Sequence, residues 1–487
     1  MVDFEPVIGL EVHAQLLTQS KIFCGCSTRF GGEPNTRTCP VCLGLPGALP
    51  VLNREAVTMS IKTALALNCR LNQRSVFARK NYFYPDLPKG YQISQFDLPL
   101  AEDGCVELLT GERSEAGNIV NYKKKKFGII RLHLEEDAGK SIHDAGDTTY
   151  VNLNRSGVPL IEIVSRPDFR SSQEAYDYVS YLRRVLLYLG VSDGNMEEGS
   201  LRCDANVSVR PKGREKFGTK TEIKNLNSFR FLQKALDYEI KRQVSEIEAG
   251  RDISQETRLW DPDREQTFVM RSKEEAHDYR YFPEPDLPPL EVSDDWLQEA
   301  RNSILELPEA KRERFCARFG LSDVDALLIC SSRESADYYE KAAVRSKNPG
   351  GVARWFIGDF SALLKRDGGD LSQVKIRPEH LAEMVEMIDS GEISGKIAKQ
   401  IFEEIWSTGE SPQDAARRLG MRQISDSAAL GQIVESVIAS NPGQVADYRA
   451  GKTKLLAFFV GQVMKETRGQ ANPHLLNELL RRKLGQV

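Results

Sequence analysis

The stretch that decides the fold is Val7-Ile-Gly-Leu-Glu-Val-His-Ala-Gln-Leu16, near the start of a chain of 487 residues. Apolar and polar side chains alternate along it, which is typical of a β-strand with one face on a core and the other face open. Glu11 and His13 fall on the polar face. The stretch therefore predicts a half-buried strand that presents an acid and an imidazole on the same side.

A second stretch, residues 201–210, alternates in the same way and puts Arg202 and Asp204 on its polar face. Two similar polar faces, far apart in the sequence, favour a sheet in which strands from distant segments lie side by side. Two further runs suit strands, residues 129–134 and 158–164.

Two helices are predicted to interrupt these strands. The first begins at a capping box formed by Ser171 and Glu174 and ends at Gly190. The second follows Ser228 and ends near Gly250. Strands mixed with a few helices predict a mixed sheet in this part of the chain.

From Trp296 onward the strand pattern gives way to helical periodicity, and four prolines within residues 283–289 form the expected linker. The predicted fold class is therefore α+β, with a mixed-sheet N-terminal domain followed by helical domains. The expected domains are residues 1–293, residues 294–408 and a helical tail of residues 409–487.

Two short thiol pairs, Cys24-Gly-Cys26 and Cys39-Pro-Val-Cys42, are separated by a pliable loop. Each pair fixes two ligands on a tight turn, so the four sulfurs can form a tetrahedral shell around one structural Zn²⁺. A redox pair or free thiols are the alternatives. The remaining cysteines are interpreted as small core residues of a protein in a reducing compartment: Cys69, Cys105, Cys203, Cys316 and Cys330.

The bulk composition is that of an ordinary soluble protein, with 28% charged residues and a net charge of −4. This charge argues against a general polyanion binder, so any nucleic-acid contact must be local. No signal-like start or membrane span is evident in the sequence, and a cytoplasmic protein is expected.

Carboxylates are concentrated on the polar faces of the predicted strands. Oxygen-rich clusters with one imidazole suit Mg²⁺ or Mn²⁺, which hold phosphate oxygens during phosphoryl transfer. Interleaved basic groups, among them Lys80 and Arg202, would suit a nucleoside triphosphate. An ordinary salt-bridged surface is the alternative. The polar positions concerned are Glu11, His13, Glu135 or Glu136, Glu162, Asp204 and Glu222.

The C-terminal segment carries the clearest nucleic-acid signal. From residue 451 to the end there are seven Lys or Arg against two Glu, on predicted helices. A solvated amphipathic helix is the alternative. Residues 446–453 also fit a relaxed phosphate-loop pattern, but no convincing strand precedes them, so we interpret the match as coincidence.

Six motifs follow one another along the chain: Val7-Ile-Gly-Leu-Glu-Val-His13, Arg79-Lys-Asn-Tyr-Phe-Tyr-Pro-Asp86, Tyr91-Gln-Ile-Ser-Gln95, Leu132-His-Leu-Glu-Glu-Asp-Ala-Gly-Lys140, Met196-Glu-Glu-Gly-Ser-Leu-Arg-Cys-Asp-Ala-Asn206 and Lys224-Asn-Leu-Asn-Ser228. Together they resemble the GatB family, the B subunits of tRNA-dependent amidotransferases. The resemblance covers essentially the whole chain.

The resemblance implies a cradle-shaped catalytic domain and an ATP-dependent carbon–nitrogen ligase. The side-chain carboxylate of a mischarged Glu-tRNA(Gln) or Asp-tRNA(Asn) would be phosphorylated by ATP, and ammonia would then displace the phosphate. Phosphorylation supplies a leaving group that a carboxylate lacks, and Mg²⁺ neutralises the developing charge.

The resemblance also suggests roles for single residues. Glu135 shares a strand face with His133, whereas the family points to Glu136, and a bulge would reconcile the two. Glu136 is therefore the expected ligand. The expected magnesium ligands and catalytic residues are Glu11, His13, Glu136 and Glu162, and the expected ATP contacts are Asp204, Glu222, Lys80 and Arg202.

The sequence has no evident constellation for hydrolysing glutamine. The resemblance implies that an amidase, the A subunit of the complex, supplies ammonia and that a small C subunit completes the assembly. Two rival functions remain open: a non-catalytic tRNA-binding adaptor, and a free-standing ligase for small acids that needs no tRNA.

Overall fold

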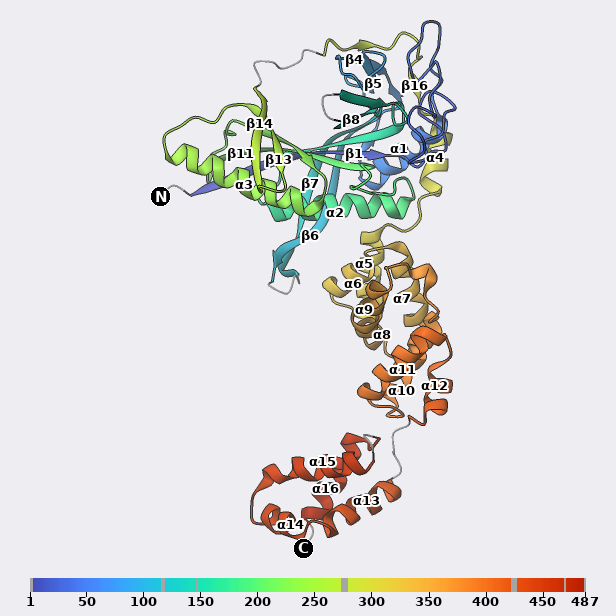
Figure 1. The fold of residues 1–487 in the computed structure, drawn as a ribbon, viewed down its shortest axis with the longest axis vertical. Helices are drawn as coiled ribbons and strands as arrows, with labels where there is room; N and C mark the ends of the chain where they lie inside the picture. Colours follow the sequence, from blue (N-terminus) through green and yellow to red (C-terminus); the bar gives the residue numbers. More distant parts are fainter. Residues whose placement is uncertain are drawn as a thin grey trace. The chain divides into compact units, whose positions relative to one another are not determined.

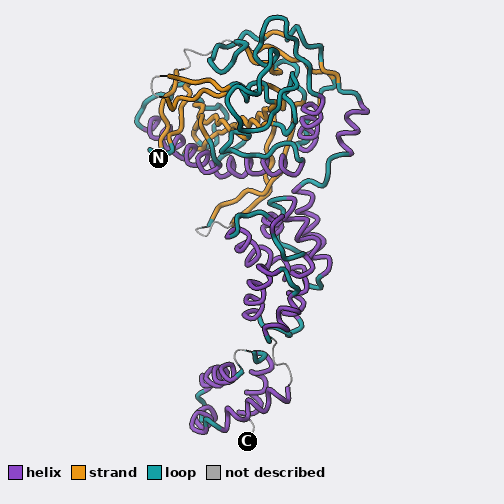
Figure 2. Tube along the Cα trace, turned by 45° about the vertical axis from the view of Figure 1, so that its right-hand side comes forward, coloured by secondary structure: helices purple, strands orange, loops and turns teal. Residues whose placement is uncertain are grey.

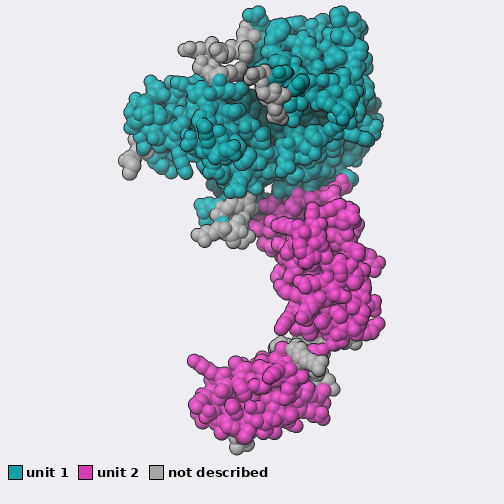
Figure 3. All heavy atoms as spheres, viewed as in Figure 1, with its two compact units in different colours: residues 1–309 teal, residues 310–487 magenta. Residues whose placement is uncertain are grey.

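The computed structural model describes residues 3–114, 119–145, 148–272, 279–421, 427–467 and 470–485. They divide into two compact units, residues 1–309 and 310–487 (Figure 3). The described strands all lie in the first unit, and the described elements of the second unit are helical (Figure 2). The predicted α+β class is confirmed.

A nine-stranded sheet organises the first unit (Figure 1). All neighbours are antiparallel except the parallel pair β12 and β13, so the sheet is mixed as predicted. In spatial order the strands are β14 (Gln266–Ser272), β13 (Glu256–Asp261), β12 (Thr221–Leu226), β11 (Leu201–Pro211), β1 (Phe4–Gln15), β10 (Pro159–Ser165), β7 (Ile119–Glu136), β6 (Ala101–Arg113) and β2 (Arg70–Leu71).

Three helices pack on the apolar face of this sheet: α1 (Arg54–Ala66), α2 (Ser172–Leu189) and α3 (Phe229–Glu248). The Ser171 hydroxyl caps α2 as predicted, accepting a hydrogen bond from the Glu174 amide, whereas the Glu174 carboxylate accepts from the Arg170 amide and not from Ser171 as a full capping box would have it. Gly190 ends α2 in the left-handed conformation, as expected. The helices bury one side of the sheet and leave the polar faces of its central strands open.

A small sheet lies against the C-terminal end of β7. Its strands are β4 (Phe77–Asn81), β5 (Tyr91–Gln95) and β15 (Phe282–Pro283). β5 is fixed to β7 through side chains. The side-chain amide of Gln92 donates to the Glu136 backbone carbonyl at 2.6 Å, and the Leu134 backbone amide donates to the side-chain oxygen of Gln95 at 3.1 Å. This contact brings Lys80 of β4 beside the open face of the large sheet. Two two-stranded sheets complete the first unit, β3 (Arg74–Ser75) with β16 (Leu290–Glu291) and β8 (Lys140–Ala145) with β9 (Thr148–Asn152).

The remaining described helices are α4 (Asp294–Asn302), α5 (Pro308–Phe319), α6 (Asp323–Ile329), α7 (Arg333–Arg345), α8 (Pro349–Trp355), α9 (Ser361–Arg366), α10 (Pro378–Asp389), α11 (Gly395–Thr408), α12 (Pro412–Leu419), α13 (Ser427–Ala439), α14 (Pro442–Arg449), α15 (Leu456–Glu466) and α16 (Pro473–Gly485). Short η helices join some of them: η2 (Phe356–Phe360), η3 (Leu371–Gln373) and η4 (Thr453–Leu455). Residues 442–449 are helical, so no strand precedes the apparent phosphate loop.

Buried clusters extend past both predicted domain boundaries. Ala300 of α4 belongs to the core of the first unit, although residue 293 was the expected end of that domain. Ala415 and Ala416 belong to the core that starts at Phe315, beyond the expected boundary at 408. A third core is formed by residues within 430–484. Helical periodicity indicates where a helix begins but not which hydrophobic core it joins. The division of the chain into three domains remains a prediction.

Candidate functional site

The strand register brings polar residues from four strands into one row. In the antiparallel ladders His133 of β7 lies opposite Glu162 of β10, Glu162 lies opposite His13 of β1, and His13 lies opposite Arg202 of β11. Directly opposed residues in antiparallel strands have side chains on the same face and close together. The next row pairs Glu11 with Asp204. The polar faces predicted from alternation therefore meet.

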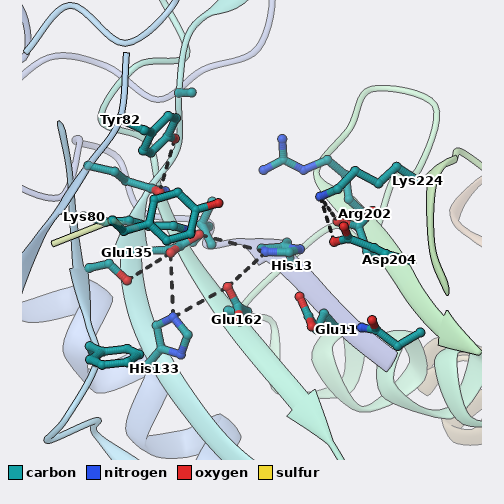
Figure 4. A pocket seen from close by; sticks show the side chains of 18 of the residues that line it. Glu11, His13, Lys80, Tyr82, His133, Glu135, Glu162, Arg202, Asp204 and Lys224 are labelled. Atoms are coloured by element: carbon teal, nitrogen blue, oxygen red, sulfur yellow. Dashed lines mark hydrogen bonds and ion pairs between the residues drawn. The ribbon is translucent and has the colours of Figure 1, made fainter. Parts of the chain in front are cut away.

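These rows line a cavity of about 570 Å³, here called the cradle pocket (Figure 4). Its size is within the range of small-molecule sites. It brings together seven of the predicted site residues: Glu11, His13, Lys80, Glu162, Arg202, Asp204 and Glu222. Glu135 also lines the pocket, whereas Glu136 is not among its lining residues.

Three groups in the pocket have the spacing of a metal site. One ligand atom each from His13, Glu135 and Glu162 lies within 4.8 Å of the others. The His13 Nε2 atom is 3.1 Å from a Glu162 oxygen and 4.0 Å from a Glu135 oxygen. Two carboxylates and an imidazole that converge from three strands suit Mg²⁺ or Mn²⁺. The donor set fits the predicted metal, with Glu135 in the position expected of Glu136.

His133 is a further member of this cluster. It is 3% exposed, and its Nε2 atom lies 3.6 Å from Glu162 and 3.7 Å from Glu135. Although burial favours the neutral acid, the charge of His133 and the hydrogen bond to His13 hold the pKa of Glu162 well below its usual value. Burial likewise opposes the charged form of His13, but the hydrogen bond with Glu162 and the negative charges of Glu162, Glu135 and Asp204 together outweigh burial and raise the pKa of His13. The acids are thus kept ionised and attract positive charge.

A second acidic group lies farther along the same face. Lys224 donates to Asp204 at 3.0 Å and lies 3.3 Å from Glu222. Glu11 stands between the two groups, accepting a hydrogen bond from Asn206 at 3.1 Å. Burial, with the negative charge of Glu162 adding to it, raises the pKa of Glu11. A bound cation would therefore strongly stabilise the charged form of Glu11.

Glu136 points away from the cradle pocket. Its carboxylate pairs with the ammonium of Lys89 and accepts a hydrogen bond from the Ile93 amide at 2.8 Å. It lines a separate, smaller cavity beside Cys24 and Cys42. The register is continuous from Leu134 to Glu136, and the bulge in this pair of strands lies between Val164 and Ser165 instead. Without a bulge, alternation decides which glutamate faces the pocket, and it selects Glu135.

Lys80 and Arg202 reach the pocket from opposite sides (Figure 4). Burial works against the charge on Lys80, but the surrounding acidic groups, Glu135 first among them and then Tyr281 and Glu162, together outweigh burial and raise the pKa of Lys80. Arg202 donates to the buried Asp137 at 2.9 Å. Both cations therefore remain charged beside the acids, as a site for phosphate requires.

Sequence reasoning missed several residues of the pocket. His133 could have been found, because it shares the strand face of Glu135. Tyr279 and Tyr281, which come later in the chain, also line the pocket. The two later tyrosines follow no periodic pattern, and they reach the site because β15 pairs with β4.

The four cysteines lie close together at one end of the same unit. Their sulfurs are within 4.8 Å of one another. The Cys39 and Cys42 sulfurs are 3.9 Å apart, close to the roughly 3.8 Å that a tetrahedral ion with bonds of about 2.3 Å would impose. A hydrogen bond from Cys24 lowers the pKa of Cys42 to about 4, and the thiolate is the form that binds zinc. None of these four cysteines forms a disulfide, and the donor set fits Zn²⁺.

Comparison with known proteins adds independent information. The family described as the GatB/GatE catalytic domain matches residues 6–298, and the family described as the GatB domain matches residues 337–484. The B subunit of the aspartyl/glutamyl-tRNA(Asn/Gln) amidotransferase of Carboxydothermus hydrogenoformans is 54% identical over 491 residues, with all of both chains covered. The proteins of the same name from Thermodesulfovibrio yellowstonii and Persephonella marina are 54% and 52% identical, covering 98–99% of this chain and 99–100% of their own.

Proposed function

The chain belongs to the GatB family, as the B subunit of a tRNA-dependent amidotransferase, and from this premise we propose that the cradle pocket is where the amino acid carried by tRNA is activated. The substrate would be Glu-tRNA(Gln), Asp-tRNA(Asn) or both. A side-chain carboxylate oxygen attacks the γ-phosphorus of ATP, giving an acyl phosphate and ADP. Ammonia then attacks the acyl carbon, and phosphate leaves with the pair of electrons of the broken bond.

The observation that carries this proposal is the convergence of His13, Glu135 and Glu162 from three strands on one point of the cradle pocket. Mg²⁺ or Mn²⁺ bound there would hold phosphate oxygens and neutralise their charge. Glu11, the neighbour of His13 on the same face of β1, is a further carboxylate for a second position, and Asp204 and Glu222 also line the pocket. Because Glu136 is engaged with Lys89 and the Ile93 amide, we assign the ligand role to Glu135.

Basic side chains around the acids have a separate task. Lys80, Arg202 and Lys224 all line the pocket. Charge-assisted hydrogen bonds from these groups would orient the triphosphate and stabilise the charge that develops on the transferred phosphoryl group. The buried partners of Lys80 and Arg202 restrict their motion, so little ordering would be needed when ATP binds.

Ammonia would come from a partner. We propose that an amidase, the A subunit of the complex, is its source and that a small C subunit is a further member. Zn²⁺ held by Cys24, Cys26, Cys39 and Cys42 would be structural, since four protein ligands leave no open coordination position. Among the described helices, none has the length and apolar character needed to cross a bilayer.

The metal assignment is tested by comparing Glu135→Gln with Glu136→Gln in the assembled amidotransferase. We expect Glu135→Gln to weaken Mn²⁺ binding, followed by electron paramagnetic resonance, by at least about 10-fold. It should also abolish ATP cleavage stimulated by Glu-tRNA. Glu136→Gln should leave Mn²⁺ affinity nearly unchanged and instead lower the melting temperature, because it leaves the buried Lys89 unpaired.

The control is Glu107→Gln, which removes an exposed carboxylate outside the pocket. Unchanged turnover in Glu135→Gln and Glu11→Ala with intact tRNA binding would favour the adaptor function. Equal ATP cleavage with and without tRNA would favour the small-acid ligase.

A further inference from the structure

A second cavity, here called the side hollow, adjoins the cradle pocket. It has a volume of about 380 Å³, and Arg202 lines both cavities. Strand β1 also connects them, because Glu11 and His13 line the cradle pocket and Gln15, next on the same face, lines the side hollow. Gln15 donates to Asp137 at 2.7 Å, and Asp137 lines the cradle pocket. A ligand in the side hollow would therefore lie directly beside the proposed activation site.

The wall of the side hollow has the composition of a nucleotide site. Arg29, Lys140, Arg155 and Arg202 face it, against Glu197 and Glu198. Arg155 and Arg202 are already engaged with Asp137. Within the part of the chain that the structure describes, no ion pair is recorded for Arg29 or Lys140, and both are exposed. Two cations at the rim of a cavity are thus free to contact phosphate.

Phe30 stands beside these cations with 67% of its surface exposed. An exposed phenylalanine next to basic side chains is the usual arrangement for stacking an unpaired base. Gly31 and Gly32 follow it with φ of +76° and +88°, so the chain turns sharply in a conformation that glycine adopts without strain.

The loop that carries Arg29 and Phe30 is held in place. Asn35 donates to the Val151 carbonyl at 3.0 Å and accepts from the Leu153 amide at 2.7 Å. Asn154 donates to the Glu33 carbonyl at 2.8 Å and accepts from the Arg37 amide at 2.9 Å. The loop also runs between the two cysteine pairs. Phe30 is therefore presented by a braced segment.

We propose that the side hollow binds the terminal nucleotide of the tRNA that carries the amino acid, with the base on Phe30 and the backbone phosphates against Arg29 and Lys140. This proposal rests on the proposed function. The amino acid is esterified to the terminal ribose, only a few bonds from the carboxylate to be activated. Its nucleotide must therefore lie in a cavity that adjoins the cradle pocket.

One observation favours RNA over the adenosine of ATP as the occupant. Another hollow, of about 520 Å³, shares Gln15, Arg29 and Phe30 with the side hollow. Two adjoining hollows that share one exposed aromatic residue would provide a path for a strand that continues past its last nucleotide. Arg29, which lines both hollows, and Lys140, which lines the side hollow, would contact the phosphates of that strand. The adenosine of ATP ends at its base and would need neither feature.

The test uses the assembled amidotransferase with Phe30→Ala, Phe30→Trp and Arg29→Gln. Loss of base stacking should raise the KM for aminoacyl-tRNA in Phe30→Ala by roughly 5-fold to 100-fold, with the KM for ATP unchanged. Phe30→Trp keeps an aromatic surface for stacking, so its KM for aminoacyl-tRNA should stay near that of the wild type. Arg29→Gln should raise this KM and make its dependence on salt less steep, by about one unit of the logarithmic slope. Phe217→Ala and Arg214→Gln remove an exposed phenylalanine and an exposed arginine elsewhere and are the matched controls.

A small probe separates the terminal nucleotide from the rest of the tRNA. The probe is a fluorescently labelled CCA trinucleotide that carries glutamate on its 3′ ribose through a non-hydrolysable amide, with binding followed by anisotropy. Phe30→Ala should weaken its binding by the same factor as the KM for aminoacyl-tRNA. A probe affinity unchanged in Phe30→Ala, or a KM raised for ATP instead of tRNA, overturns the proposal.

Failure of the proposed function would give a different pattern. Glu135→Gln would then retain amidation, and this result says nothing about Phe30. Probe binding is measured without turnover, so its loss in Phe30→Ala supports the side hollow whichever carboxylate holds the metal.

Discussion

At the scale of single residues, Lys21 shows how the cysteine cluster is held in the fold. It is fully buried, and its ammonium donates to the Arg37 carbonyl at 2.8 Å and to the Leu153 carbonyl at 3.4 Å. It also lies 3.6 Å from the Cys42 sulfur. A zinc ion with four thiolates carries a net charge of −2, so a buried ammonium beside one of them offsets part of it.

We predict that Lys21→Met weakens zinc retention. Removing a hydrogen-bond partner of a ligand typically costs about 10-fold to 100-fold in metal affinity. The measurement is zinc release to a chromogenic chelator, together with the melting temperature, which should also fall. Lys241→Met, which removes an exposed lysine from α3, is the control. A variant that retains zinc as well as the wild type would show that Lys21 serves only the packing of the loop.

The glutamate pair at the end of β7 shows how far a sequence can determine a site residue. Alternation from His133 predicted that Glu135 faces the pocket, whereas family resemblance pointed to Glu136. The pattern of the strand is local, and it is reliable as long as no bulge intervenes. The position of a bulge depends on the partner strand, and here it falls at Val164 and Ser165, which nothing in the sequence of β7 reveals.

At the scale of elements, α10 of the helical unit contains a histidine that the fold keeps neutral. His380 is 3% exposed, and its Nε2 atom accepts from the Arg377 guanidinium at 2.9 Å and 3.2 Å. Burial, and then the charge of Arg377, lower the pKa of His380. Below about pH 6.5, the ordinary pKa of histidine, His380 binds a proton more readily in the unfolded chain than in the folded chain. Stability therefore falls as the pH drops.

We predict that protection of the α10 amides from hydrogen exchange decreases between pH 7.5 and pH 5.5, after correction for the intrinsic exchange rate. His380→Gln keeps an acceptor for Arg377 but cannot be protonated, so its protection should change less over the same range. If the two proteins lose protection equally, His380 is not the group responsible, and other titrations in the unit must be examined.

Elements differ in how well the sequence predicts them. The ends of α2 were predictable because Ser171, Glu174 and Gly190 act within one or two turns of the helix. The small sheet of β4, β5 and β15 was not, since β4 and β15 are separated by about two hundred residues and only tertiary packing pairs them. Lys80 was nevertheless predicted as a site residue, but from its charge and the family resemblance and not from its strand.

At the scale of the whole molecule, a chain with net charge −4 must present its positive charge locally if it is to bind RNA. The tail does so. Lys452 pairs with Asp447 and Lys483 with Glu435, and Arg468 lies outside the described residues. The other basic residues of the segment are exposed, and no ion pair is recorded for them in the described chain: Lys454, Lys465, Arg481 and Arg482.

We predict that the triple variant Lys465→Gln, Arg481→Gln, Arg482→Gln binds tRNA more weakly, with a salt dependence less steep by about 0.9 for each phosphate that is no longer neutralised. Its affinity for the aminoacylated trinucleotide should be unchanged, because that probe lacks the tRNA body. The control removes three exposed lysines from the preceding part of the same unit, Lys341, Lys347 and Lys396. It has the same net charge, so equal losses in the two triple variants would mean that overall charge, and not the tail surface, governs tRNA affinity.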